Sequence, residues 1–224
     1  MSRRILVINP NASLACTRGI AAALAPLPMP PGLALEVTHL PEGPPAIASW
    51  EDWHGVAQPL CRLVEREPAA AYVIACVSDP AVEAVRTVTR APVLGPLRSA
   101  VAAALARADR FGIIAMADAS LPRQRRALAA MGVEARLAGH LPLNLDMEVL
   151  TDPVAPRAAL LDAARRLAEM GAEAVILGCA GMAGHRAAAE AACGVPVIEP
   201  CQAAAALAIQ AVVAARPAVA QAAE

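Results

Sequence analysis

Short apolar runs alternate along this chain with longer stretches rich in alanine and arginine, and the alternation predicts most of its elements. The short runs have the length of buried strands. They lie at residues 4–9, 33–38, 72–76, 92–95, 111–116, 134–138, 174–178 and 195–198. The stretches between them have helical length and lie at 13–25, 54–66, 80–89, 97–108, 121–131, 156–170, 183–193 and 201–215. Strands that alternate with helices indicate βαβ units and a parallel sheet.

The order of these elements repeats in the two halves of the chain. The matching segments are 5–9 with 112–116, 72–79 with 174–182, and 91–96 with 195–200. Cys76 precedes Pro92 by 16 positions (92 − 76), and Cys179 precedes Pro196 by 17 (196 − 179). Three matched pairs at matched spacing favour two homologous lobes over chance similarity.

The repeat defines the expected architecture. We expect an α/β fold of two pseudo-symmetric lobes, each a parallel sheet flanked by helices, with the active site in the cleft between them. Residues 1–96 with 201–224 would form the first lobe and 97–200 the second. The last helix is assigned to the first lobe because the second lobe already has its own set of strands and helices without it. Cys76 and Cys179 each end a buried strand, where open α/β sheets bind ligands, so they would face each other across the cleft.

The basic residues exclude several classes of enzyme. The net charge of −1 gives no reason to expect nucleic acid or a membrane as a partner. All 19 basic residues are arginine, which excludes a pyridoxal phosphate Schiff base and a P-loop, since both need lysine. No Gly-x-Gly-x-x-Gly follows a strand, so a nicotinamide cofactor has no support. We therefore expect no cofactor.

The cysteines point to free thiols. The six lie at 16, 61, 76, 179, 193 and 201, with no Cys-x-x-Cys pair and no histidine at metal spacing, so no metal site is expected. The first apolar run breaks at Asn9-Pro10, too soon for a signal peptide, and no run is long enough to span a membrane. We therefore expect the protein to be cytoplasmic. We also expect it to form a homo-oligomer and to bind a small-molecule substrate.

Four segments carry a resemblance to a known family. Residues 8–13 (Ile-Asn-Pro-Asn-Ala-Ser), 75–80 (Ala-Cys-Val-Ser-Asp-Pro) and above all 177–182 (Leu-Gly-Cys-Ala-Gly-Met) resemble hydantoin and allantoin racemases of the aspartate/glutamate racemase superfamily. Residues 45–49 align with the family's loop over the site. The similarity covers roughly residues 4–213. It implies two pseudo-symmetric lobes and two cysteines as acid and base, which map onto Cys76 and Cys179.

The chain also departs from the family pattern. Residues 77–81 read Val-Ser-Asp-Pro-Ala where hydantoin racemases usually have Phe-Gly-Asp-Pro-Gly, and Ala115 and Met116 stand where they usually carry threonines. The substrate wall is therefore expected to be less polar than in the family.

The expected chemistry is proton abstraction next to a carbonyl. Backbone N–H groups after each cysteine, including those of Ala180 and Gly181, would stabilise the enolate. The N-termini of helices 80–89 and 183–193 would lower the thiol pKa values toward neutrality. The further expected substrate contacts are Asn9, Ile47, Ser78, Asp79 and Met116.

The remaining cysteines and charged residues have plainer interpretations. Cys16, Cys61, Cys193 and Cys201 are interpreted as buried small apolar residues. Arg123, Arg125 and Arg126 are interpreted as a solvated helix face, as is His185.

The sequence thus predicts a cofactor-independent racemase of a small cyclic amide, such as a 5-substituted hydantoin or allantoin. Alternatives within the superfamily are an aspartate/glutamate-type amino-acid racemase and a maleate cis–trans isomerase. An alternative of a different class is a non-catalytic small-molecule binding protein.

Overall fold

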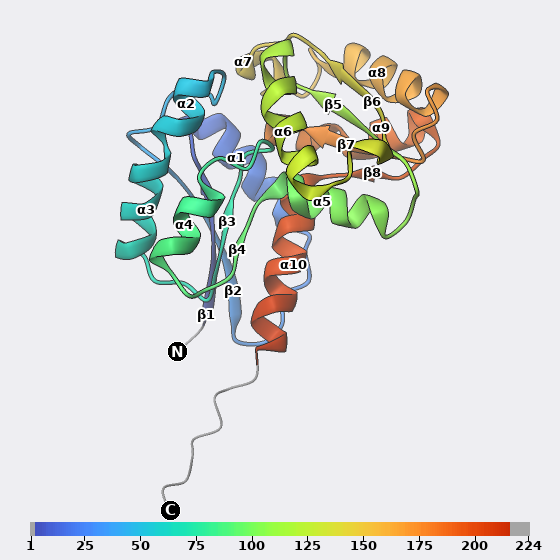
Figure 1. Ribbon diagram of the computed structural model, residues 1–224. Coiled ribbons are helices and arrows are strands. Elements are labelled where there is room, and N and C mark those ends of the chain that lie inside the picture. The colour runs from blue at the N-terminus through green and yellow to red at the C-terminus, as the bar shows by residue number, and fades with distance from the viewer. Residues whose placement is uncertain (1–2, 216–224) are drawn as a thin grey trace, which may run out of the picture.

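The computed structural model describes residues 3–215 and contains two parallel four-stranded sheets, one in each of two lobes (Figure 1). The first sheet has the order β2-β1-β3-β4 and the second β6-β5-β7-β8. The strands are β1 Arg3–Asn9, β2 Leu33–His39, β3 Ala71–Ile74, β4 Val93–Leu94, β5 Phe111–Ala115, β6 Leu137–Pro142, β7 Ala174–Gly178 and β8 Val197–Ile198. The predicted α/β fold with two similar lobes is confirmed.

Helices cover both faces of each sheet. They are α1 Leu14–Leu24, α2 Trp50–Gly55, α3 Ala57–Arg66, α4 Val82–Val88, α5 Pro96–Leu105, α6 Leu121–Met131, α7 Met147–Thr151, α8 Arg157–Glu169, α9 Arg186–Cys193 and α10 Pro200–Ala214, with 3₁₀ turns η1 Asp118–Ser120, η2 Glu134–Arg136 and η3 Ala180–His185. In the first lobe, α1 and α10 pack on one face and α2, α3 and α4 on the other. In the second lobe, α5 and α6 face α8 and α9 across the sheet.

This two-sided packing explains the uninterrupted apolar strands. In β1, Ile5 and Val7 join the core beneath α1 and α10, whereas Leu6 and Ile8 join the core beneath α3 and α4. Because successive strand residues point to opposite faces, a sheet covered on both sides needs apolar residues at every position. Each large aliphatic side chain buried in this way contributes about 1.5–3 kcal/mol to stability.

The chain crosses between the lobes at two helices. α5 follows β4 of the first sheet but buries Leu97 and Val101 in the core of the second lobe. α10 follows β8 of the second sheet and returns to the first, where Cys201, Ala204 and Val212 join the core with Ile5 and Val7 (Figure 1). The two lobes therefore share a continuous interior along α5 and α10, which contact each other.

Three predicted elements were misplaced and one short helix was missed. The strand expected at 134–138 is β6 at 137–142, because residues 134–136 form η2 directly after the left-handed Gly132 that ends α6. The helix expected at 54–66 begins at Trp50, where Ser49 and Asp52 form a capping box, and is divided into α2 and α3. The helix expected at 183–193 begins only at Arg186, after η3. The short helix α7 was not predicted.

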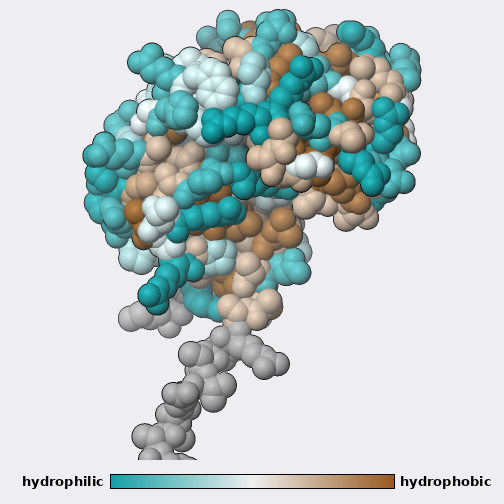
Figure 2. Space-filling model, in the orientation of Figure 1, coloured by the Kyte–Doolittle hydropathy of each residue, from teal (hydrophilic) through white to brown (hydrophobic). Residues whose placement is uncertain are grey.

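On the face shown in Figure 2, hydrophilic and hydrophobic residues are interspersed over both lobes. Within residues 3–215, no helix has the length and apolar character that crossing a membrane requires.

Candidate active site

A small cavity lies where the two lobes meet, beyond the carboxyl ends of β3 and β7. Its volume is about 40 Å³, room for roughly three water molecules. Six of the residues expected in the site line it: Ile47, Cys76, Ser78, Met116, Cys179 and Ala180. Both lobes therefore contribute to one wall, as expected of a site in the cleft.

The two cysteines occupy equivalent places in the repeat. Cys76 follows β3 by two residues and Cys179 follows β7 directly. Both are free thiols. The Cys76 Sγ lies 3.4 Å from the Ser78 Oγ, and the Cys179 Sγ accepts the Gly181 N–H. One thiol from each lobe thus reaches the same small space.

The residue after each cysteine is buried in the opposite lobe. Val77, from the first lobe, packs in the core formed by α5 and α6 of the second. Ala180, from the second lobe, packs in the core formed by α1 and α10 of the first. Each cysteine turn is therefore fixed by both lobes, and their relative position is set by the packing of the interface.

Gln124 of α6 joins the two turns directly. Its Nε2 donates to the Val77 carbonyl at 2.9 Å and to the Gly178 carbonyl at 3.0 Å. Since carbonyls only accept, the amide orientation is fixed, and the Gln124 Oε1 must accept the His140 Nε2–H at 2.7 Å. The Gln124 side chain is 1% exposed. Sequence analysis missed this residue.

Burial sets the protonation of the thiols. It raises the pKa of Cys76 and, more strongly, that of Cys179. At Cys76 the hydrogen bonds of Ser78 oppose the effect. The expectation that helix N-termini lower both pKa values is not met, because Cys179 leads into the 3₁₀ turn η3 and α4 begins only at Val82.

Comparisons with known proteins agree with this architecture. The family model for Asp/Glu/Hydantoin racemase matches residues 5–208. The chain belongs to this family. A hydantoin racemase of Paenarthrobacter aurescens is 37% identical over 90% of this chain and 87% of its own length. One of Pseudomonas sp. (strain NS671) is 36% identical over 88% and 80%. The structure of the allantoin racemase from Klebsiella pneumoniae superposes with a TM-score of 0.87, at 30% identity, covering 95% of this chain and 88% of that one. The protein is thus an isomerase of the racemase type.

Arg123 of this racemase is buried, which corrects its interpretation as part of a solvated face. Its side chain lines the cavity and is 4% exposed. Its Nη1 donates to the Ala48 carbonyl at 3.0 Å and its Nη2 to the Ile47 carbonyl at 3.2 Å. The arginine thereby ties the 45–49 segment to α6. His185 is also buried, with its Nε2 3.2 Å from the Asp152 carbonyl.

Two other residues of the expected site lie behind the wall. The Asn9 side chain is fully buried and donates to the Asn11 Oδ1 at 2.8 Å and the Thr17 Oγ1 at 3.0 Å. It therefore fixes the start of α1, and Asn11 lines the cavity in its place. Gly181 contributes its N–H to the Cys179 sulfur. Cys16, interpreted as a buried apolar residue, is buried but also lines the cavity, and burial raises its pKa to about 12.

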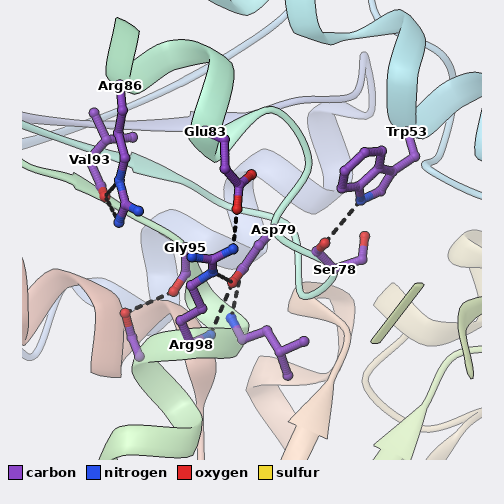
Figure 3. Close-up of polar contacts among 10 residues, drawn as sticks. Trp53, Ser78, Asp79, Glu83, Arg86, Val93, Gly95 and Arg98 are labelled. Carbon is purple, nitrogen blue, oxygen red and sulfur yellow. Dashed lines mark hydrogen bonds and ion pairs between the residues drawn. The ribbon is translucent and has the colours of Figure 1, made fainter. Parts of the chain in front are cut away.

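Asp79 also lies outside the cavity wall, because its carboxylate caps α5 (Figure 3). Its two oxygens accept the Leu97 N–H at 2.8 Å and the Arg98 N–H at 3.0 Å. The Arg98 Nε lies 3.5 Å from the same carboxylate. Burial raises the Asp79 pKa to about 6, although these contacts favour the ionised carboxylate. Asp79 thus connects the first cysteine turn to the helix that enters the second lobe.

Replacing Gly95 with alanine should destabilise the protein by about 1–3 kcal/mol. A Cβ at Gly95 would lie 2.4–2.6 Å from the Asp79 carboxylate and push it off the α5 N-terminus. Urea unfolding measures the effect. Gly19→Ala is the matched control, because a Cβ there meets nothing within 4 Å in helix α1 and should stabilise slightly. Equal stability of the two variants would contradict the role of Asp79 as the cap of α5.

His140 should make the stability fall in acid. Burial, aided by Arg125, lowers its pKa from 6.5 to about 4. Between these values the unfolded chain binds a proton that the folded state does not, so the unfolding free energy should drop by up to about 1.4 kcal/mol for each pH unit lost. Asp79, with its raised pKa, acts in the opposite direction from pH 6 downward. The measurement is therefore the difference between wild type and His140→Gln in urea unfolding from pH 7 to pH 4, and a constant difference would contradict the prediction.

Among residues 3–215, no group of three or more His, Cys, Asp or Glu side chains is arranged to hold a metal ion.

Proposed function

We propose that this racemase inverts the stereocentre of a small cyclic amide of the hydantoin type, with Cys76 and Cys179 as its two acid/base groups and without a cofactor. The observation that carries the proposal is that one strand-end thiol from each lobe lines the same cavity. Relatives that share about a third of its sequence are named as hydantoin racemases. A structural relative is named as an allantoin racemase.

The proposed reaction moves one proton across one carbon. A thiolate on one side removes the proton from the carbon between the ring carbonyl and the ring nitrogen, and the electron pair delocalises onto the carbonyl oxygen as an enolate. The thiol on the opposite side then donates its proton to that carbon. The first sulfur ends as a thiol and the second as a thiolate, so the same pair acts on the other enantiomer with exchanged roles. In this proposal the hydroxyl of Ser78, which lies beside Cys76, donates to the enolate oxygen.

The 45–49 segment is the part of the cavity wall that we expect to adjust when substrate binds. The wall residue Ile47 belongs to the 45–49 segment, which lies over the cavity and is held by Arg123. Displacement of this segment would admit the ring and its substituent without separating the cysteine turns.

The charges on the wall favour a cyclic amide over an amino acid. Among the described residues that line the cavity, Arg123 is the one with a charged side chain. An amino-acid zwitterion needs an anionic partner for its ammonium group as well as a cationic one for its carboxylate. A neutral ring with two carbonyls and two N–H groups needs only hydrogen bonds, and the wall residues Ser78, Asn11 and Ser120 have polar side chains that could make them.

Proton NMR in D₂O tests the proposal on enantiopure substrates under reducing conditions. The panel contains allantoin, benzyl- and isopropylhydantoin, aspartate, glutamate and maleate, and Cys76→Ala/Cys179→Ala serves as the control. We expect loss of the stereocentre proton of at least one cyclic amide above the uncatalysed rate, abolished in the control. Exchange of an amino acid alone, or isomerisation of maleate alone, would overturn the substrate class. Silence throughout would favour a binding protein.

A further inference from the structure

Arg123 is a buried cation that forms no ion pair with a carboxylate of the described residues. Its two terminal nitrogens donate to neutral backbone carbonyls, and its Nε is buried without a hydrogen-bond partner. Within residues 3–215, no carboxylate oxygen lies within 4.0 Å of its guanidinium. A guanidinium removed from water without a counter-charge is costly. Its place on the cavity wall indicates that an anion forms inside the cavity.

The acidic residues nearby make other contacts and lie beyond ion-pair distance of Arg123. Asp52 interacts electrostatically with Arg123, but its Oδ2 accepts the backbone N–H groups of Ala48 and Ser49 at 3.0 and 2.8 Å. Asp79 caps α5 and pairs with Arg98. The acidic groups left on the cavity wall are the thiols of Cys16, Cys76 and Cys179.

These thiols differ in what surrounds them. Cys76 has Arg123 as a cationic neighbour and two hydrogen-bonding groups of Ser78, its hydroxyl and its N–H, with Asp79 as the opposing charge. Cys179 has the Gly181 N–H and faces Cys16 and Cys76, with no cation among the groups that act on it. The one group that stabilises a charge on Cys16 is the Asn11 side chain, through a hydrogen bond. Cys201 lies beneath the wall and faces Glu199 and the other three thiols. A negative charge in the cavity is therefore most favourable on Cys76.

We infer that Arg123 is the counter-cation that stabilises the Cys76 thiolate when it forms, so that Cys76 is the base and Cys179 the acid. The Cys76 S–H bond breaks, the proton leaves to solvent, and the sulfur keeps the electron pair opposite the guanidinium. Arg123 acts through Cys76 and is a positioning residue. The catalytic part of this inference rests on the proposed function, whereas the ion pair itself does not.

Arg123 also has a structural role, and two variants separate the roles. Arg123→Met keeps the length of an apolar stem and removes the charge together with both bonds to the 45–49 segment. Arg123→Lys keeps a positive charge but cannot hold two carbonyls with a rigid planar fork. If the arginine served only to hold the segment, both variants would behave alike. If it serves as a counter-cation, only Arg123→Met changes the ionisation of Cys76.

The test is the pH dependence of iodoacetamide alkylation at each cysteine, read by peptide mass spectrometry. Burial changes the rate of alkylation, but the pH midpoint reports ionisation. We expect a lower midpoint for Cys76 than for Cys179 in wild type. Arg123→Met should raise the Cys76 midpoint by about 1–3 pH units, and Arg123→Lys should leave most of the effect in place. Cys61, which does not line the cavity, is the internal reference, and its midpoint should stay the same in all three proteins.

Two results would overturn the inference: an unchanged Cys76 midpoint in folded Arg123→Met, or a Cys179 midpoint below that of Cys76 in wild type. The second needs no variant, so the inference stays testable if Arg123→Met fails to fold. Racemisation is measured separately on the same samples. Shifted midpoints without turnover would reject the proposed function alone, and turnover with unshifted midpoints would reject the ion pair alone.

Discussion

Cys179→Ser should lose racemisation by at least about 10³-fold, because a serine hydroxyl is a far weaker acid than a thiol and cannot return the proton to the second face of the carbon. Cys76→Ser should lose it to the same extent, since a hydroxyl at neutral pH provides no base. Both cysteines line a cavity formed by both lobes, one from each lobe.

The two serine variants should differ in proton exchange. With Cys76 as the base, Cys179→Ser should still exchange the stereocentre proton of one enantiomer with D₂O, without inversion, and leave the other untouched. Cys76→Ser should exchange neither at a comparable rate. Polarimetry follows inversion and NMR follows deuterium, with each enantiomer supplied separately.

The matched control for these variants is Cys61→Ser, a half-buried cysteine in α3 that does not line the cavity. It should racemise as the wild type does. Substantial inversion by either Cys76→Ser or Cys179→Ser would show that the two-thiol assignment is wrong.

Gln124→Met should weaken the fold and slow the reaction together. The substitution keeps the volume of the side chain but leaves the Val77 and Gly178 carbonyls and the His140 N–H without their partner. Each buried unsatisfied group costs about 1–3 kcal/mol, so we expect a loss of roughly 3 kcal/mol or more in urea unfolding. Because the amide connects the two cysteine turns, the sulfurs should also lose their alignment, and kcat should fall by about 10²-fold with a smaller change in KM.

Gln202→Met is the control for a lost side-chain amide. Gln202 donates to the Ala23 carbonyl at 2.7 Å, between α10 and α1, and does not line the cavity. It should lower stability without altering kcat. If Gln124→Met lost stability and kept full kcat, the amide would be a structural contact that does not position the cysteines.

The sequence revealed the elements that depend on local pattern. Apolar strands covered on both sides read as unbroken apolar runs, so β1, β5 and β7 were predicted within one or two residues. The two cysteine turns were found because equivalent segments of the two halves of the chain each end in a cysteine. β6 was misplaced because a 3₁₀ turn after a glycine cap leaves no periodic signal.

The residues that were missed depend on contacts between the lobes. The first turns of α6 have the sequence Leu-Pro-Arg-Gln-Arg-Arg, which is typical of a polar, exposed helix face. In the structure, however, Arg123 is buried against the 45–49 segment and Gln124 against the cysteine turns. A usable signal was present: Ser120, Gln124 and Leu128 are spaced four apart and share one face, which Leu128 marks as the inner one. Asn9 and Asp79 were assigned to substrate because their positions at strand ends do not show whether a side chain points outward or caps a neighbouring helix.

The thiol electrostatics also needed the structure. Helix N-termini were expected to lower both pKa values, yet burial outweighs them at both sulfurs. The cytoplasmic location and the homo-oligomeric state stay predictions.

The position of α10 bears on how the polypeptide is made. The core beneath β1 is completed by Cys201, Ala204, Ala205, Ala208 and Val212, so the lobe that contains β1 lacks part of its interior until residues 201–212 have been synthesised. The core of the other lobe closes with residues no later than Ala203. During synthesis, the lobe whose first strand is made first is therefore the lobe whose core is completed last.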